Sequence, residues 1–274
     1  MGARIGEYEL TCLVDTHGVV GPFAEVFSDV PAEAWSPYRD LYPDLFDDSG
    51  WRPPFGCFLL RSERHVVLVD AGVGPPGGSF LPDAEGLLPS ALAELGIGPE
   101  HIEVCALTHL HVDHVGWVSR DGRPLWPRAS YFASRRDFNW VEGRDPLERD
   151  RILRPMVSLL RAGSLSLVEE PTEIAPGIRT VPTPGHTPGH SSIRIESQGS
   201  QAIILGDVAV HPALLDRPEW IYLFDVDPEA TVATRRALLE DIEDQDIIVA
   251  CGHYPGGIGR IGREGSHTVW RAIE

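Results

Sequence analysis

Hydrophobic and polar positions follow two kinds of spacing along this chain. Residues 7–15 alternate apolar and polar side chains, which is typical of a strand with one buried face. Short apolar runs predict further strands at 58–60, 66–69, 102–107, 129–133, 165–168, 178–181, 191–196, 201–205 and 247–250. Apolar positions at helical spacing predict helices at 87–95, 134–141, 146–162 and 228–241. The chain is therefore expected to be α/β.

The order of these segments predicts how the sheets are arranged. Strands come in pairs with helices between them, and the second half repeats the plan of the first. This order favours two sheets packed face to face with helices outside. No stretch has the composition of a linker, so we expect residues 1–274 to form a single domain of two similar halves.

Three stretches are expected to lie outside regular elements. His17 follows the first strand and is expected in a loop, and the glycine and proline run at 72–78 predicts another. Residues 31–55 are rich in prolines, acids and aromatic side chains. We expect this long segment either to pack on the core or to serve as a lid that lines a pocket.

Charge and composition narrow the class of protein. The chain has 274 residues, 42% of them hydrophobic, and a formal net charge of -18, with arginine as its only basic residue besides histidine. So acidic a surface disfavours a nucleic-acid partner. The first ten residues do not resemble a signal peptide and no segment reaches membrane-spanning length, so we expect a cytoplasmic protein with no membrane partner. The four cysteines are widely spaced and are expected to be buried, reduced thiols: Cys12, Cys57, Cys105 and Cys251.

The run Thr108-His109-Leu110-His111-Val112-Asp113-His114 carries the strongest chemical signal. It follows the predicted strand at 102–107, and α/β folds commonly place active sites at the carboxyl ends of their strands. His109 and His111 are two residues apart, so both side chains point to one side of an extended segment. Imidazole and carboxylate ligands suit Zn²⁺ or a similar ion, whereas structural zinc sites more often use thiolates. The run therefore predicts a catalytic centre, with two metal ions as our interpretation.

Three later segments resemble this run in kind. Pro184 to His190 form a tight loop that contains His186 and His190, Asp207 ends an apolar strand, and His253 follows the last predicted strand. Each is weak evidence alone, because a single histidine or aspartate at a strand end is commonly a hydrogen-bonded loop residue. Together with the first run, all occur where a strand stops, which favours one shared metal centre.

With these residues in place, the chain resembles the metallo-β-lactamase-fold hydrolase superfamily. Its five signatures are matched in order by Asp70, by His109-x-His111-x-Asp113-His114, by His186, by Asp207 and by His253. The resemblance implies a four-layer αββα sandwich with the metals at one edge. The runs from His111 to Trp117 and from His253 to Gly256 are similar to the branch that contains quorum-quenching N-acyl homoserine lactonases and methyl-parathion-type organophosphate hydrolases.

The resemblance also implies roles for individual residues. His109, His111 and His186 would hold one metal, Asp113, His114 and His253 the other, and Asp207 would bridge them. Asp70 and His190 would orient these ligands. The expected cofactors are two divalent ions, with Zn²⁺ first and Mn²⁺ or Fe²⁺ as alternatives. A metal-bridging hydroxide would attack the substrate, and Asp113 would also act as the catalytic acid/base that carries the proton to the leaving group.

The substrate is less determined by the sequence. We expect a small-molecule lactone or related ester with an apolar body, and thioesters, aryl esters and phosphotriesters remain alternatives. Lactonases of this fold carry a tyrosine three residues after the bridging aspartate, where this chain has Val210. Residues considered for substrate contacts, some of them as replacements for that tyrosine, are Trp51, Phe55, Trp117, His211, Tyr222 and Tyr254.

Other function classes are less favoured. An iron-dependent redox enzyme of this fold is one alternative, but its diiron flavoprotein branch has an acid where His111 stands, and we expect no flavin-binding domain in this chain. A nuclease is disfavoured by the acidic charge, and a non-catalytic binding module by the full ligand set. The oligomeric state is left open, with a homodimer as one option.

Overall fold

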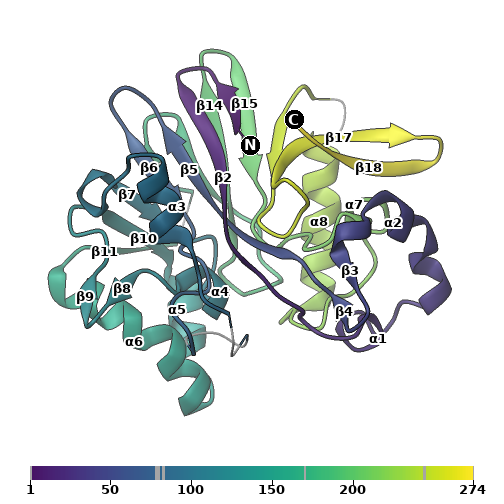
Figure 1. Ribbon diagram of the computed structural model, residues 1–274, viewed down its shortest axis with the longest axis horizontal. Coiled ribbons are helices and arrows are strands. Elements are labelled where there is room, and N and C mark those ends of the chain that lie inside the picture. The colour runs from purple at the N-terminus through teal and green to yellow at the C-terminus, as the bar shows by residue number, and fades with distance from the viewer. Residues whose placement is uncertain (1, 78–80, 82–83, 170, 243–244, 274) are drawn as a thin grey trace.

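A computed structural model describes residues 2–77, 81, 84–169, 171–242 and 245–273, and consists mainly of two sheets (Figure 1). In spatial order, the first sheet contains β1 (Gly2–Ile5), β2 (Tyr8–His17), β5 (Pro54–Arg61), β6 (Val66–Val69), β7 (Val104–Ala106), β10 (Ser130–Ser134) and β11 (Leu165–Val168). The second contains β12 (Glu173–Ala175), β13 (Ile178–Pro182), β14 (Ser191–Ser197), β15 (Ser200–Ile204), β16 (Ile248–Ala250), β17 (Ile258–Glu264) and β18 (His267–Ala272). Each half of the chain thus builds one sheet.

The helices lie on the outer faces of the two sheets (Figure 1). Those beside the first sheet are α3 (Leu88–Glu94), α4 (Val112–Val115), α5 (Arg135–Glu142) and α6 (Pro146–Ala162). Those beside the second sheet are α1 (Phe23–Val26), α2 (Ser36–Leu41), α7 (Ala213–Asp216) and α8 (Pro228–Ile242). Short 3-10 turns occur at Ala32–Trp35, Pro43–Leu45 and Pro99–His101, and small hairpins join β3 (Phe46–Asp47) to β4 (Gly50–Trp51) and β8 (Ser119–Arg120) to β9 (Arg123–Pro124).

Three hydrophobic clusters separate four layers. On β5, Phe58 and Leu60 point into the cluster between the sheets, whereas Cys57 and Leu59 point into the cluster shared with α3, α5 and α6. This alternation follows from the two-residue period of a strand. On β15, Ile204 faces the other sheet and Ile203 faces the cluster beside α7 and α8. The layers are therefore helix, sheet, sheet and helix, which confirms the predicted fold class.

Most predicted elements are confirmed, with several differences. The prediction for His17 was wrong, because it is the last residue of β2 and pairs with Pro54. The sequence did not reveal β1, β12, β17 or β18. The outer hairpin β17–β18 reads Ile258-Gly-Arg-Ile-Gly-Arg-Glu on its first strand, where exposed arginines and glycines hide the apolar alternation. Of the predicted loop at 72–78, residue 78 lies outside the described residues.

Residues 31–55 were predicted to lie outside regular elements, and this prediction was wrong. They form two 3-10 turns, helix α2, the β3–β4 hairpin and the start of β5. Trp35, Tyr38, Tyr42, Leu45 and Trp51 from this segment are buried in the cluster that covers the second sheet. The segment is thus packed on the core.

The cysteines are free thiols, as predicted. Cys57, Cys105 and Cys251 are buried, and burial raises the pKa of each well above its usual range, which keeps these thiols protonated. Cys12 was predicted to be buried and is instead partly exposed. Within the described part of the chain, no helix is both long and apolar enough to cross a membrane.

Candidate metal centre

The histidine run lies where a central strand of the first sheet ends. β7 is flanked by the parallel strands β6 and β10, and the chain continues from it through Thr108 and His109. At His111 the chain turns into the single turn of α4, which contains Asp113 and His114. His109 and His111 therefore precede this turn and the next two side chains come from it, and the side chains of His109 and His111 reach the same group of ligand atoms, as their spacing predicted.

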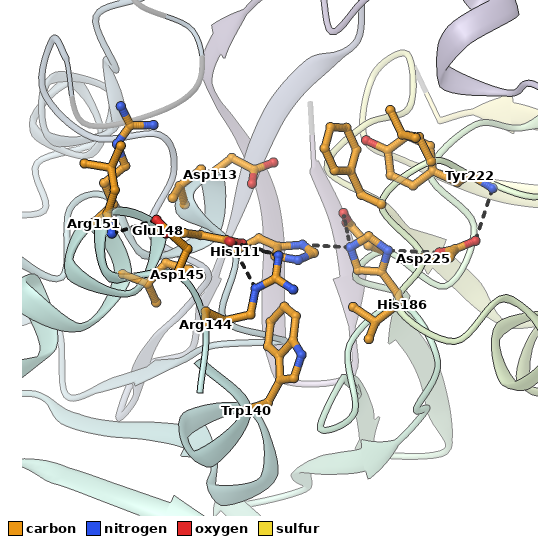
Figure 2. Close-up of a pocket in the computed structure, with 17 residues that line it drawn as sticks. His111, Asp113, Trp140, Arg144, Asp145, Glu148, Arg151, His186, Tyr222 and Asp225 are labelled. Carbon is orange, nitrogen blue, oxygen red and sulfur yellow. Dashed lines mark hydrogen bonds and ion pairs between the residues drawn. The ribbon is translucent and has the colours of Figure 1, made fainter. Parts of the chain in front are cut away.

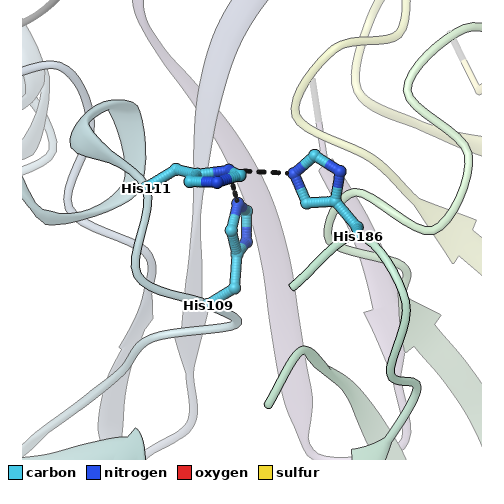
Figure 3. A group of neighbouring side chains, drawn as sticks. All are labelled: His109, His111 and His186. Carbon is cyan, nitrogen blue, oxygen red and sulfur yellow. Dashed lines mark hydrogen bonds between the residues drawn. The ribbon is translucent and has the colours of Figure 1, made fainter. Parts of the chain in front are cut away.

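His109, His111 and His186 form a first group of converging nitrogens (Figure 3). His111 Nδ1 lies 3.1 Å from His109 Nε2 and 2.9 Å from His186 Nε2. His186 comes from the loop between β13 and β14 of the second sheet. The two halves of the chain thus meet at this group.

Asp113, His114 and His253 form a second group, whose three ligand atoms lie within 4.8 Å of one another. Asp113 Oδ2 is 3.6 Å from His114 Nε2 and 3.8 Å from His253 Nε2. His253 follows β16, the last strand that the sequence predicted.

Asp207 lies between the two groups. Its Oδ2 is 3.8 Å from His109 Nε2 and 3.4 Å from His186 Nε2. Its Oδ1 is 3.5 Å from His114 Nε2 and 3.4 Å from His253 Nε2. One carboxylate oxygen thus faces each group, which is the arrangement of a bridging ligand.

Hydrogen bonds at the far side of each ring determine which nitrogen has the proton. His114 Nδ1 is 2.9 Å from Asp70, His186 Nδ1 is 3.0 Å from Asp225, and His253 Nδ1 is 3.0 Å from a backbone carbonyl. Carboxylate and carbonyl oxygens only accept, so each Nδ1 donates, and in the neutral ring each Nε2 presents a lone pair to the centre.

His109 follows the same rule through Thr108. The Thr108 hydroxyl donates to Asp70, so its oxygen accepts from His109 Nδ1 at 3.1 Å. His109 Nε2 therefore presents a lone pair too. His114 Nε2 is buried and makes no hydrogen bond with any described residue. Ring nitrogens and carboxylate oxygens that converge in this way are the donor set of a cation, so the residues fit bound metal ions.

Burial and neighbouring charges act differently on the two groups. Burial and nearby imidazoles hold the pKa values of His109 and His111 well below their usual range, which keeps both neutral. Burial also disfavours charged His114, but Asp70, Asp207 and Asp113 raise its pKa well above the usual range. Burial likewise raises the pKa of Asp207, yet His253, His114 and His109 hold it well below its usual range. The carboxylates of Asp70, Asp113 and Asp207 thus favour positive charge at His114, which is consistent with a cation bound at this position.

A pocket of about 490 Å³ opens over this centre (Figure 2). His111, Asp113, His186 and Asp207 lie on its floor. One wall comes from α5, α6 and their connection, and includes Trp140, Arg144 and Leu147. The opposite wall is the segment Tyr222–Val226. Leu147, Leu223, Phe224 and Val226 remain 66%, 58%, 45% and 42% exposed and make part of the mouth apolar, while exposed Arg144, Asp145 and Arg151 add charge on the α6 side.

Comparisons with known proteins agree with this geometry. Residues 57–253 match the profile of the metallo-beta-lactamase superfamily. The chain belongs to this superfamily. N-acyl homoserine lactonase AiiA of Bacillus thuringiensis subsp. kurstaki is 25% identical over 215 residues, which cover 73% of this chain and 81% of that protein.

Two solved structures of the same superfamily fold span the whole chain. The hydrolase AbOPH superposes with a TM-score of 0.87 at 24% identity, covering 100% of this chain and 97% of that one. AidC, a dizinc quorum-quenching lactonase in complex with the product N-hexanoyl-L-homoserine, superposes with a TM-score of 0.85 at 20% identity and the same coverage. At these identities the two likenesses bear on the fold.

Asp70 and His190 were predicted to orient the metal-binding residues, and both lie beside these residues. Asp70 accepts hydrogen bonds from Thr108 N at 2.8 Å and from His114. Its φ of 63° is in the left-handed region, a strain that folds commonly retain at functional sites. His190 Nε2 accepts from Asp207 N at 2.8 Å, while its Nδ1 donates to the Thr183 carbonyl at 3.1 Å. Burial lowers the pKa of His190 to about 3, so it stays neutral.

Of the six residues considered for substrate contacts, the structure brings only Tyr222 to the wall of this pocket. Trp51 and Phe55 are buried behind His253, with ring centroids 6.0 and 5.2 Å from it. Of the other three, Trp117 and Tyr254 lie in hydrophobic clusters and His211 is buried against the rings of Trp35 and Phe46, and none of them lines the pocket.

These three side chains have partners in the core. Trp117 Nε1 donates to Asp15 at 3.0 Å, and His211 Nδ1 accepts from Ala213 N at 3.0 Å. The Tyr254 hydroxyl is 3.5 Å from the His211 carbonyl. These three residues were considered for substrate contacts, and their burial in the core corrects that prediction. Val210, the position of the lactonase tyrosine, is also buried in the core.

Sequence reasoning missed two buried acids at the centre. Asp137, in the first turn of α5, accepts from Leu110 N, Thr187 Oγ1 and Gly189 N, and so joins the first histidine run to the loop that contains His186. Asp225 accepts from His186 Nδ1. Ser134-x-x-Asp137 is a helix-start pattern, which gave no sign of burial, and nothing around Asp225 distinguishes it from a turn residue.

Proposed function

We propose that this chain is a two-metal hydrolase that opens a lactone or cleaves a related ester of an apolar small molecule. The observation that supports this most directly is the carboxylate of Asp207 between two groups of converging ligand atoms, on the floor of a pocket whose mouth exposes the apolar side chains of Leu147, Leu223, Phe224 and Val226. Lactonase activity is the named function of the relative AiiA, and AidC is named a dizinc lactonase.

His109, His111 and His186 would hold one ion and Asp113, His114 and His253 the other, with Asp207 shared. Two bound divalent ions, with zinc proposed, supply an activated water at neutral pH and stabilise the negative charge that develops on the substrate oxygen. Each of the five imidazoles would bind through one ring nitrogen, and four of them hold a proton on Nδ1 by donating it to a fixed acceptor, which leaves Nε2 for the metal.

Asp113 is the proposed acid/base of the reaction. Its side chain lines the pocket, and its Oδ2 is oriented toward His114 and His253. A carboxylate in this place can receive a proton during attack and return it to the leaving oxygen. No thiol competes for a nucleophilic role among the described residues, because all four cysteines stay protonated.

Tyr222 is the proposed substitute for the tyrosine that lactonases of this fold carry where this chain has Val210. Its ring stacks on His186, with a centroid separation of 5.9 Å and an interplanar angle of 16°. Burial, with Asp207 and Asp113 nearby, raises the pKa of Tyr222 well above its usual range, so the hydroxyl remains a hydrogen-bond donor. It would orient the carbonyl of the substrate.

The experiment that tests the function combines metal analysis with steady-state kinetics on a matched lactone, thioester, aryl ester and phosphotriester. We expect about two ions per chain and a preference for the lactone of about 100-fold in kcat/KM, which corresponds to roughly 2.7 kcal/mol in barrier height. A similar preference for another substrate of the panel would reassign the reaction class.

His109→Ala is expected to abolish turnover, because it removes a proposed ligand. The matched control is His101→Ala, since His101 is an exposed imidazole outside the centre. Full activity in metal-stripped protein would contradict the proposal.

A further inference from the structure

The pocket wall Tyr222–Val226 and the loop that contains His186 are joined through their backbones. Val226 N donates to the His186 carbonyl at 3.1 Å, and Asp227 N donates to the Gly185 carbonyl at 3.0 Å. Two backbone hydrogen bonds thus attach the wall to the loop that contains His186. A displacement of one would move the other.

Asp225 links the same two parts through its side chain (Figure 2). Its Oδ1 lies 3.0 Å from His186 Nδ1, and its Oδ2 accepts from Tyr222 N at 3.2 Å. The carboxylate is almost fully buried. One oxygen therefore fixes a proposed metal ligand and the other fixes the pocket wall.

Arg235 of α8 compensates the charge of this buried carboxylate. Its side chain is 1% exposed, and its Nη2 lies 3.7 Å from Asp225 Oδ2. Its remaining donors bind the backbone carbonyls of Val208, Pro218 and Trp220 at 2.7–2.8 Å. These contacts hold the guanidinium in place, because the fixed carbonyls leave it little freedom to turn. A buried carboxylate without such a partner would be costly.

We propose that Asp225 is a positioning residue that couples the metal-facing nitrogen of His186 to the substrate-binding wall Tyr222–Val226. The inference rests on the proposed metal centre and on the assignment of the pocket to the substrate. By accepting from Nδ1, Asp225 leaves Nε2 of His186 free to bind metal. By accepting from Tyr222 N, it keeps the stacked Tyr222 ring beside that ligand.

The coupling requires two acceptor atoms, which makes Asp225→Asn a sharp test. A carboxylate accepts at both oxygens, but an amide accepts at one and donates at the other. If the amide oxygen faces His186, the amide NH₂ is directed at Tyr222 N–H. If the amide is flipped, His186 must accept at Nδ1 and place its proton on Nε2, where metal would bind. Either orientation disrupts one of the two parts.

The experiment measures zinc retention against a competing chelator, together with kcat and KM, for the wild-type protein, Asp225→Asn and Asp225→Ala. We expect one of the two ions to bind about 10–100-fold more weakly in both variants, as found when partners of metal-binding histidines are removed. KM is expected to rise with the displaced wall. His186→Ala shows which ion depends on this ligand.

Asp216→Asn is the matched control. Asp216 is also a mostly buried carboxylate that accepts from an imidazole, His267 Nδ1 at 2.8 Å, but it lies outside the pocket. It should lose stability while keeping both ions. Circular dichroism and thermal unfolding establish that each variant is folded, and the isosteric Asn variant serves if the Ala variant does not fold.

Retention of both ions at wild-type affinity by folded Asp225→Asn would overturn the inference, as would the absence of zinc from the wild-type protein. Weaker zinc binding with unchanged KM would show that Asp225 does not couple His186 to the wall, and would also overturn the inference. If the wild-type protein binds two ions but cleaves none of the panel substrates, the proposed reaction fails while zinc retention still decides the role of Asp225 in holding His186.

Discussion

Asp137 provides the most direct test of how the two halves of the chain are held at the proposed centre. Its Oδ2 accepts from Leu110 N at 3.1 Å and from Thr187 Oγ1 at 2.8 Å, and its Oδ1 accepts from Gly189 N at 2.6 Å. Leu110 separates His109 from His111, and Thr187 follows His186. Asp137→Asn can keep the two bonds at one oxygen, but it directs an amide NH₂ at the Gly189 N–H.

The cost of this substitution follows from the hydrogen bonds. Replacing one buried charge-assisted bond by a donor–donor contact costs about 2–4 kcal/mol. For a chain of this size, that corresponds to a fall in Tm of roughly 4–16 °C. Because a displacement of about 1 Å at a catalytic group can cost about 100-fold in rate, we expect kcat/KM to fall by roughly that factor.

Asp15→Asn is the control for Asp137→Asn, because both carboxylates are buried and accept hydrogen bonds at both oxygens. Asp15 Oδ1 accepts from Leu88 N at 2.7 Å and Trp117 Nε1 at 3.0 Å, and Oδ2 accepts from Val73 N at 2.7 Å. None of these donors adjoins a proposed ligand.

Both variants should lose similar stability, measured by thermal unfolding, but only Asp137→Asn should lose most of its activity at a temperature where both are folded. Equal losses of activity would refute the reasoning and assign Asp137 a purely structural role. Wild-type stability in Asp137→Asn would refute the hydrogen-bond estimate itself.

Three further predictions follow from the site and the core. Tyr222→Phe removes the proposed donor and should lower kcat/KM about tenfold, or roughly 1.4 kcal/mol, with the metal content unchanged. Chelation should lower Tm, and zinc at about 100 times its dissociation constant should restore roughly 2.7 kcal/mol of stability. Burial raises the pKa of Asp216, but hydrogen bonds from His267, Tyr38 and Thr268 outweigh it and lower the pKa. The folded protein thus releases this proton more readily, so Asp216 stabilises it above about pH 4 and less as pH falls through the folded pKa. Unfolding of Asp216→Asn across pH 2–7 should show a deficit at neutral pH that shrinks in acid.

Each of these predictions has an outcome that contradicts it. Unchanged kcat/KM in Tyr222→Phe would leave the substrate carbonyl to another donor. A Tm insensitive to chelator would argue against ions bound in the folded state. A stability deficit of Asp216→Asn that is constant with pH would mean that ionisation of this carboxylate does not contribute.

The sequence predicted the central strands and the ligand set because both depend on local patterns. β7, β16 and, up to Leu60, β5 contain no polar side chain, and a strand that is buried on both faces has to be apolar throughout. The ends of such strands stand out wherever histidine or aspartate follows, as at His109, Asp207 and His253. β17 and β18 escaped notice because each leaves many of its side chains exposed.

The residues that hold the ligands were less visible, because their role depends on contacts between distant parts of the chain. Asp225 is 39 residues from His186, and Asp137 is 50 residues from Thr187. Neither stands at a strand end or in a histidine run. The prediction of substrate contacts at Trp117 and Tyr254 was wrong for a related reason. Both side chains could contact a substrate, but the polar atom of each has a partner within the core.

One physical regularity separates these buried acids from the rest of a strongly acidic chain. The acidic residues that are buried among the described residues are all aspartates, namely Asp15, Asp70, Asp137, Asp207 and Asp225. An aspartate places its oxygens close to the backbone, where they can accept from neighbouring N–H groups and rings, and it loses less rotamer freedom on burial than glutamate. Asp225→Glu should therefore fail as a conservative change, because the longer chain has to fold back to reach His186 and Tyr222. Wild-type zinc retention by this variant would show that charge at the position is sufficient and that the position of the two oxygens is not decisive.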